Sequence, residues 1–258
     1  MKISIVTINY NNRLGLVDTL LSISKSTKST DEQVEVIVID GGSDDGSLEV
    51  INDFRHMVTK FVSEPDDGIY DAMNKGVELS SGDSIIFMNS GDRFFYDFDF
   101  DAFFKYLVEN GIDLSKMTIF GDNCIKIGDA ILLRKISSND NSPCHQSMFV
   151  PRHVLLNFKF NCRYKICADY DQKIKILSNT HTLHYPYFVC INELGGVSNN
   201  WPSYRKVFQH VAELVSIDNL NVFRSVLLGI NVVLKKFLID IIGYKKFYLL
   251  LHVLKIKN

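Results

Sequence analysis

The stretch between residues 63 and 92 carries polar side chains whose types and spacing fit a bound diphosphate and metal ion. Its central segment, residues 69–78, has helical periodicity, with apolar side chains on one face. The polar members of the whole stretch are Asp67, Asp71, Asn74 and Lys75, then Asn89, Ser90 and Asp92. A hard divalent cation takes carboxylate and phosphate oxygens together, so an acid at a strand tip suits such an ion. A solvated helix face and a plain turn explain these residues separately but not their combination.

Two earlier strand ends carry residues that fit a nucleoside. Thr7 and Tyr10 lie at the end of the first apolar strand. At that position an aromatic ring could stack on a planar base. Asp40 ends a second buried strand, EVIVID, and a carboxylate there costs free energy unless it is paired or used for binding. The alternatives are a helix cap with a core tyrosine for the first segment and a tight turn for GGSDDGS after the second.

Alternating strands and helices would bring these polar segments together. The predicted strands are residues 2–8, 35–40, 60–64 and 84–88, and the predicted helices between them include 47–55 and 69–78. Apolar strands joined through helices by short loops imply parallel pairing with right-handed crossovers. In such sheets ligands bind beyond the carboxyl ends of the strands, where the polar segments lie. The second half predicts a helix at 99–109, a hairpin turning at Gly128-Asp129 and a strand at 183–191.

Length and composition narrow the class of protein. A chain of 258 residues permits one large domain with an appendage. The formal net charge of -2 gives no signature of nucleic-acid binding. The five cysteines are scattered without a CxxC pair, which indicates reduced thiols and not a disulfide framework or zinc site. Neither a secretory signal nor a membrane-spanning apolar run is evident, so we expect a cytoplasmic location.

The order of four segments resembles a known family. SIVTINYNN, VIDGGSDDGS, SEPDDGIYDAMNKGVELSSGD and FMNSGD follow one another as in family 2 glycosyltransferases with the GT-A fold, especially the bacterial branch that builds O-antigen, capsule and exopolysaccharide. The resemblance covers roughly residues 2–201. It implies an α/β fold with a Rossmann-like, mostly parallel sheet flanked by helices. It also implies a nucleotide-diphospho-sugar donor, a divalent metal ion (Mn²⁺ or Mg²⁺) and inversion at the anomeric carbon by direct displacement.

The resemblance implies a role for each polar strand end. Thr7, Tyr10 and Asp40 match nucleoside-binding positions. The donor-binding segment before and within the third helix contains Asp67, Asp71 and Lys75. Asn89, Ser90, Gly91 and Asp92 occupy the place of the DxD-like metal motif, with Asp92 as the matching acid. Asn89 and Ser90 depart from a strict DxD, which leaves open how strictly the metal is required.

Two segments of the second half complete the implied site. CHQSMFVPR around His145 and Gln146 resembles the acceptor-side HQ segment, and the alternative is a hydrogen-bonded core histidine. ICADYDQKIKI resembles the segment with the catalytic base, for which Asp169 is the match and Asp171 the near alternative. Asp169 could otherwise be a first-turn acid favoured by the helix dipole. GGVSNN at 195–200 resembles a small active-site loop, or equally a turn.

The C-terminal segment differs from the rest of the chain. We assign residues 1–215 to the transferase domain and 216–258 to a basic amphipathic helical extension, because apolar runs there are broken by lysine pairs at 235–236 and 245–246. Such a helix suits the anionic inner face of the cytoplasmic membrane. Packing on the core or on a second copy of the chain, as a homodimer, is the alternative.

The resemblance predicts a transferase that moves a hexose or N-acetylhexosamine, with uridine diphosphate as the expected carrier, onto a saccharide or lipid-linked saccharide acceptor. Two other classes compete with this interpretation. A nucleotide-sugar-binding protein that has lost catalysis would explain the imperfect metal motif, although Asp92 and Asp169 together favour the enzyme. A nucleotidyltransferase would carry a glycine-rich phosphate loop near the N-terminus, which TINYNNRLG lacks.

Overall fold

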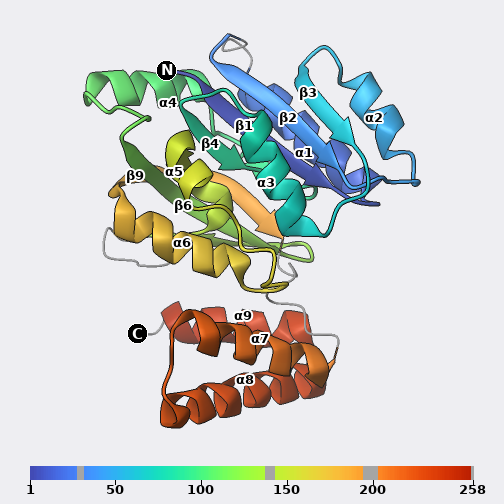
Figure 1. Ribbon diagram of the computed structural model, residues 1–258, viewed down its shortest axis with the longest axis vertical. Coiled ribbons are helices and arrows are strands. Elements are labelled where there is room, and N and C mark those ends of the chain that lie inside the picture. Colours follow the sequence, from blue (N-terminus) through green and yellow to red (C-terminus); the bar gives the residue numbers. More distant parts are fainter. Residues whose placement is uncertain (28–31, 137–142, 194–202, 257–258) are drawn as a thin grey trace.

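The computed structural model describes residues 1–27, 32–136, 143–193 and 203–256. In this part of the chain a nine-stranded sheet is covered by helices on both faces, and three further helices form a separate layer below it (Figure 1). The strand order is β3-β2-β1-β4-β8-β6-β9-β5, with β7 paired to β6. The α/β class predicted from the sequence is therefore confirmed.

The first four strands form the parallel half of the sheet, as predicted. They are β1 (Ile3–Asn9), β2 (Val34–Asp40), β3 (Val58–Ser63) and β4 (Ser84–Phe87), connected by α1 (Arg13–Ser26), α2 (Ser47–Asp53) and α3 (Ile69–Leu79). β1 and β2 are buried along their whole length, which explains their continuous apolar sequences. In the register of this half, Asn9 lies beside Asp40 and Asp40 beside Ser63.

Beyond β4 the predicted mostly parallel sheet becomes mixed. β4 pairs antiparallel with β8 (Met148–Pro151), and β8 pairs antiparallel with β6 (Met117–Ile127). β6 then pairs parallel with β9 (His181–Glu193), whose other neighbour is the short antiparallel strand β5 (Arg93–Phe94). The predicted hairpin is present, because β6 turns at Gly128 into β7 (Ala130–Arg134). The helices of this half are α4 (Phe100–Glu109), α5 (Arg152–Asn157), α6 (Ala168–Asn179) and the short 3-10 turn η1 (His145–Ser147).

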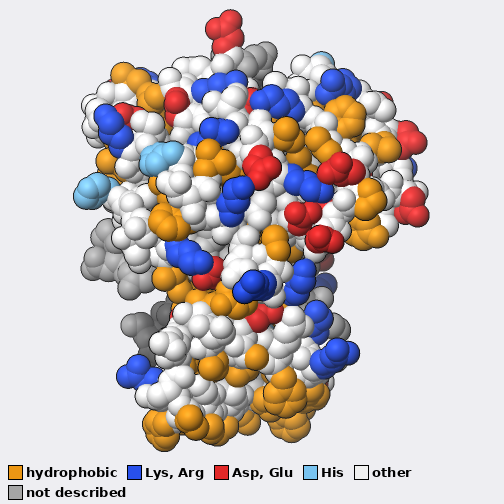
Figure 2. Space-filling view, viewed as in Figure 1, with side chains coloured by type: hydrophobic (Ala, Val, Ile, Leu, Met, Phe, Trp, Pro, Cys, Tyr) orange, Lys and Arg blue, Asp and Glu red, His pale blue; other side chains and the backbone are white. Residues whose placement is uncertain are grey.

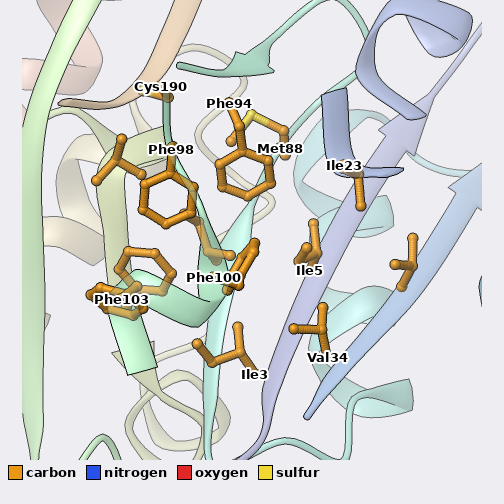
Figure 3. Packing of buried hydrophobic residues seen from close by; sticks show 14 of the residues in the cluster. Ile3, Ile5, Ile23, Val34, Met88, Phe94, Phe98, Phe100, Phe103 and Cys190 are labelled. Carbon is orange, nitrogen blue, oxygen red and sulfur yellow. The ribbon is translucent and has the colours of Figure 1, made fainter. Parts of the chain in front are cut away.

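Two apolar layers hold the sheet, one on each face. The first joins α1, α2 and α4 to the sheet, and Figure 3 shows its aromatic centre around Phe94, Phe98 and Phe100. The ring of Phe103 stacks on that of Phe149 with centroids 4.4 Å apart, which fixes α4 against β8. The second layer packs α3, α5 and α6 on the opposite face. All five cysteines are free thiols.

The helical layer consists of α7 (Tyr204–Ile217), α8 (Val222–Ile242) and α9 (Tyr244–Ile256). It has a small core of its own, in which Val207 of α7 meets Val232 of α8. This unit begins before residue 216, the boundary assigned from the sequence, since α7 packs with α8. Within the described residues, none of the helices is long and apolar enough to cross a lipid bilayer.

Candidate active site

A cleft of about 560 Å³ lies at the carboxyl ends of the parallel strands. Its walls come from the segments that follow β1, β2, β3 and β4 and from the first turns of α3. The lining residues are Ile8, Asn9, Tyr10, Asn12, Gly41, Pro65, Asp66, Gly68, Ile69, Ala72, Asn89 and Ser90. Four polar segments that are far apart in the sequence thus meet in one cavity, as the strand order requires.

Asp40 forms the buried anchor beneath this cleft. Its carboxylate accepts hydrogen bonds from Asn9 Nδ2 (2.8 Å), Ser63 Oγ (2.7 Å), Ser43 N (2.9 Å) and Ser43 Oγ (2.6 Å). Burial raises the pKa of Asp40, but the hydrogen bonds from Ser43, Asn9 and Ser63 outweigh it and lower the pKa below its usual value. The ionised group therefore ties the ends of β1, β2 and β3 together.

Tyr10 and Gly41 lie close together in the cleft lining. The Tyr10 side chain is 67% exposed while it lines the cleft, so its ring is available to a planar ligand. A Cβ atom at Gly41 would lie 2.6 Å from Asp66 Oδ2 and 3.2 Å from Tyr10 Cδ2. The space between these two side chains exists because residue 41 has no side chain.

The turn after β4 carries acceptors that lack partners. Asn89 Oδ1 and Ser90 Oγ are buried, and neither has a hydrogen-bond partner among the described residues. The turn is held from α1, since Thr19 Oγ1 donates to Asp92 O at 2.7 Å and accepts from Gly91 N at 3.0 Å. Buried oxygens without partners cost free energy unless water or a ligand binds them, and these two belong to residues that line the cleft.

The same turn contains Asp92, the residue predicted to bind the metal ion. Asp92 is 9% exposed, and its Oδ2 accepts a hydrogen bond from Gln146 Nε2 at 3.0 Å. No group of three or more His, Cys, Asp or Glu side chains in the described part of the chain could hold a metal ion by itself. Mg²⁺ in nucleotide sites is bound by one or two carboxylates together with substrate phosphates. Asp92 and the neighbouring oxygens of Asn89 and Ser90 fit a cation whose remaining ligands come from a diphosphate.

Asp169 and Asp171, the two candidate bases, lie in different environments. Asp169 is half-buried in the first turn of α6, and its Oδ1 accepts from Tyr170 N at 2.9 Å and lies 3.3 Å from the Tyr70 hydroxyl. Tyr70 lies in the first turn of α3, the helix whose residues Ile69 and Ala72 line the cleft, so Asp169 contacts the helix that forms one wall of the cleft. Asp171 is instead buried, with Oδ2 2.6 Å from Lys175 Nζ. The geometry favours Asp169.

His145 is packed between aromatic rings behind the cleft. Its ring stacks on Phe87 with centroids 5.0 Å apart and meets the edge of Phe160 at 5.6 Å. Burial lowers the pKa of His145 to about 4, although the nearby Asp169 charge opposes this. The imidazole is therefore neutral near pH 7, which suits the core alternative at least as well as an acceptor contact.

The other predicted donor residues lie away from the cleft lining. Lys75 Nζ is 2.8 Å from Glu64 Oε1 and 3.5 Å from Asp71 Oδ2, and this Asp71 oxygen accepts from Asp67 N at 3.2 Å. Asp71 and Lys75 of α3 thus pair with each other and with the segment that precedes the helix, which contains Glu64 and Asp67. Thr7 is fully buried in β1, and its hydroxyl has no partner within the described residues.

Two residues of the site went unassigned in the sequence. Gly41 and Asp66 look like ordinary turn residues, and only the three-dimensional structure shows that the Asp66 carboxylate lies against Gly41 in the cleft lining. Gln146 lies beside His145 in the HQ segment, but its contact with Asp92 joins positions 54 residues apart. The predicted loop at 195–200 lies outside the described residues.

Known proteins resemble this chain in sequence and in fold. The family model for glycosyl transferase family 2 matches residues 4–142. A PGL/p-HBAD biosynthesis glycosyltransferase of Mycobacterium bovis is 29% identical over 209 residues, which cover 76% of this chain and 78% of that protein. An uncharacterized glycosyltransferase of Mycobacterium tuberculosis is 39% identical over 92 residues, 36% of this chain and 34% of that protein.

Solved structures share the fold at low sequence identity. S. aureus TarS (residues 1–349) in complex with UDP-GlcNAc has a TM-score of 0.63 and 15% identity, over 90% of this chain and 72% of that one. The mannosyltransferase PcManGT from Pyrobaculum calidifontis, in complex with GDP-Man and Mn²⁺, has a TM-score of 0.60 and 15% identity, over 83% of this chain and 64% of that one.

Proposed function

Because the chain belongs to glycosyltransferase family 2 and has the GT-A fold, we propose that it transfers a hexose or N-acetylhexosamine from a nucleotide-diphospho-sugar to a hydroxyl group of a saccharide or lipid-linked saccharide. The observation that carries this proposal is the cleft lined by the exposed Tyr10 ring and by Asn89 and Ser90, whose buried side-chain oxygens lack partners among the described residues. Asp92 follows them in the same turn. These groups match the two ends of such a donor, a planar base and a charged diphosphate.

The donor in this proposal carries uridine diphosphate. The complex of TarS with UDP-GlcNAc supports a uridine carrier, and that of PcManGT with GDP-Man supports the alternative, guanosine diphosphate. Tyr10 and Gly41 would receive the base, while Asn89, Ser90 and Asp92 would hold the diphosphate and a Mn²⁺ or Mg²⁺ ion. Such a cation would neutralise negative charge on the leaving nucleoside diphosphate.

Asp169 acts as the general base in the proposed reaction. The acceptor oxygen forms a bond to the anomeric carbon, its proton passes to a carboxylate oxygen of Asp169, and the bond from that carbon to the diphosphate breaks. Attack opposite the leaving group inverts the anomeric configuration. The Tyr70 hydroxyl stays protonated, because burial and the Asp169 charge raise its pKa, and it can orient the carboxylate. A neutral His145 with a pKa of about 4 is a poor proton donor at pH 7.

A thermal-shift screen of nucleotide sugars with and without manganese tests the proposal. A donor that binds the native state raises the melting temperature by mass action, by an amount equivalent to about 2.7 kcal/mol at one hundred times Kd. We expect a uridine diphosphate sugar to give the largest shift, and manganese to increase it. Transfer to an acceptor separates the enzyme from a protein that only binds donor. Absence of any shift with every nucleotide sugar would contradict donor binding.

The helical layer supplies the proposed contact with the membrane. Apolar side chains repeat every three or four residues along the outer face of α8, and Figure 2 shows hydrophobic side chains gathered at that end of the molecule. The members of this ridge are Val222, Phe223, Val226, Leu227, Ile230, Leu234, Phe237, Leu238 and Ile241, all exposed. Exposed cations lie near its two ends: Arg224 lies in its first turn, and Lys246 follows its second end. Lys245 is also exposed there, but its Nζ lies close to Gly128 of the turn between β6 and β7.

The lysine pair at 235–236 takes a different position from the one expected of a basic amphipathic face. Lys236 is 8% exposed and pairs with Asp240, and Lys235 lies over the Tyr248 ring at 5.1 Å. The ridge is therefore apolar along its length, with cations at its ends, which suits insertion among the headgroups of an anionic bilayer. This would bring the enzyme to a lipid-linked acceptor at the inner face of the cytoplasmic membrane.

Liposome flotation of the full chain tests the membrane contact. We expect flotation with vesicles that contain anionic lipid, and its loss when Phe223, Ile230 and Phe237 are replaced by serine. Asp53→Asn, an exposed change on the far side of the catalytic domain, is the matched control. A dimer in size-exclusion chromatography that the ridge substitutions convert to a monomer, without flotation, would instead show that a second copy covers the ridge.

A further inference from the structure

A buried carboxylate of the helical layer accepts hydrogen bonds from the catalytic domain. Glu213 of α7 is 8% exposed, and its side chain points at the segment just before α6. Its Oε1 accepts from Lys165 N at 3.0 Å, and its Oε2 accepts from Ile166 N and Cys167 N at 2.9 Å each. Gln209 Nε2 donates to Oε1 at 3.0 Å, so both carboxylate oxygens are satisfied. One side chain thus holds three consecutive backbone amides.

These amides belong to the three residues just before α6, the helix that presents Asp169. Buried backbone N–H groups need acceptors. Cys167, the N-cap residue of α6, provides no capping hydrogen bond with its side chain, and its thiol lies 3.6 Å from His210 Nδ1 instead. Glu213 supplies the acceptors for this segment from another element, 46 residues along the chain from Cys167. A negative charge at this end of α6 is also favoured by the helix dipole.

The same turn is held on its other side by Tyr70. The Tyr70 hydroxyl lies 2.8 Å from the carbonyl oxygen of Ile166 and 3.3 Å from Asp169 Oδ1. Ile166, three positions before Asp169, is therefore held on both sides. Its N–H group is bound by Glu213 and its carbonyl group by Tyr70. A rotation of this segment would carry the Asp169 carboxylate away from the cleft.

We propose that Glu213 is a positioning residue for sugar transfer: from the helical layer, it fixes the turn that places Asp169 beside the donor cleft. This inference rests on the proposed role of Asp169 as the base. Two further polar contacts from α7 and its C-cap to the catalytic domain are solvent-exposed: Tyr164 Oη to Ser216 Oγ at 3.2 Å and Tyr170 Oη to Asp218 Oδ1 at 3.2 Å. A third contact is part-buried and joins Cys167 Sγ to His210 Nδ1 of α7 at 3.6 Å, but Glu213 is the residue that binds three consecutive backbone amides.

Glu213→Gln in the full chain tests the inference by steady-state kinetics. The substitution keeps the size of the side chain but turns an amide NH₂ group toward a backbone or Gln209 donor, so the turn is no longer held as in the wild type. Misplacement of a catalytic group by about 1 Å can cost roughly 100-fold in rate. We expect kcat to fall about 10- to 100-fold while the KM for donor changes less than about twofold. Ser216→Ala, which removes an exposed contact of the same helix, should leave both constants unchanged.

A double-mutant cycle with Asp169→Asn separates positioning from general structural support. If Glu213 acts through Asp169, Glu213→Gln should cause little further loss of kcat in the Asp169→Asn background. An equal fold-loss in both backgrounds, or an unchanged kcat in the single variant, would overturn the inference. Turnover retained by Asp169→Asn alone would instead contradict the proposed base, so the two failures are distinguishable.

Glu213→Asp provides a second variant if the glutamine substitution prevents folding. It keeps the charge but is one methylene shorter, so it cannot reach all three amides at once. The same selective loss of kcat is expected, with a smaller amplitude. A folded Glu213→Asp protein with wild-type kcat would overturn the positioning role.

Discussion

The strand β2 carries a buried carboxylate near each of its ends, and the two are stabilised in different ways. Glu35, the second residue of the strand, accepts from the hydroxyls of Ser4 and Ser81 at 2.7 Å each and from Ser81 N, and it pairs with Lys2 and Lys60. Asp40, the last residue, is held by the neutral groups of Asn9, Ser43 and Ser63. Both are at most 1% exposed.

The two carboxylates also differ in the polar groups that surround them. Near Asp40, the buried oxygens Asn9 Oδ1, Asn89 Oδ1 and Ser90 Oγ have no partner in the described part of the chain, and a cleft opens above them. Around Glu35 the charge is matched by lysine side chains at the surface. At the amino end of the sheet Ser84 Oγ also lacks a partner among the described residues, but there the charged group is matched by lysines and the three oxygens of the carboxyl end have no counterpart. We therefore expect substitutions at the amino end to affect stability and those at the carboxyl end to affect donor binding.

The largest effect on transfer is expected from Asp92→Ala at the carboxyl end. Loss of this carboxylate removes the charged ligand proposed for the metal ion, so activity should be abolished together with manganese-dependent donor binding. Calorimetric titration with donor in the presence and absence of manganese measures this. Asp53→Ala, an exposed acid in α2, serves as the control. Normal manganese-dependent binding by Asp92→Ala would show that the metal role is wrong.

Asp169→Asn should have the next largest effect and should leave the donor bound. Removal of a general base typically costs about 10²- to 10⁴-fold in rate, so turnover should fall by that factor while the donor Kd stays within about twofold. Asp171→Asn is the matched comparison, because it lies two residues away and pairs with Lys175. It should lower stability more than turnover. Comparable turnover in Asp169→Asn and wild type would exclude this base.

Glu35→Gln should have the smallest effect on transfer and a clear effect on stability. Burial raises the pKa of Glu35, but hydrogen bonds from Ser81, Ser4 and Lys2 outweigh it and bring the pKa from 4.5 to about 2. A pKa that is lower in the folded state stabilises the protein above the unfolded value, here by on the order of 3 kcal/mol. That stabilisation is lost as the pH falls from about 4.5 toward about 2.

Urea unfolding of wild type and Glu35→Gln at pH 7 and at pH 3 measures this prediction. The difference in the free energy of unfolding should be larger at pH 7 than at pH 3, while kcat at pH 7 stays within about twofold of wild type. Loss of transfer in a folded Glu35→Gln protein would break the contrast between the two ends of the sheet.

The parallel half of the fold could be predicted from the sequence, whereas the second half could not be assembled from it. β1, β2 and β4 are continuous apolar runs because both of their faces are buried, so each lies within two residues of its predicted bounds. β5 has two residues and β8 has four, and their antiparallel partners lie far away in the chain. No local pattern encodes pairings of that kind.

Some features of the site could likewise be predicted from the sequence, and others could not. Tyr10, Asn89 and Ser90 could be placed at the cleft because parallel strands bring their carboxyl ends to one edge. The contact of Gln146 with Asp92 and that of Glu213 with Cys167 join distant segments through side chains. Residue type and spacing carry no signal for either contact, since both depend on how elements distant in the sequence pack together.

Donor binding by Gly41→Val, measured calorimetrically with a uridine diphosphate sugar and manganese, tests the central claim most directly. A side chain at position 41 would meet Asp66 Oδ2 and Tyr10 Cδ2, two flexible side chains at the cleft, so it should fill the nucleoside space without unfolding the protein. We expect donor binding by wild type and by Glu35→Gln, and its loss in a folded Gly41→Val protein. Wild-type affinity in Gly41→Val would contradict the placement of the donor at the carboxyl end of the sheet.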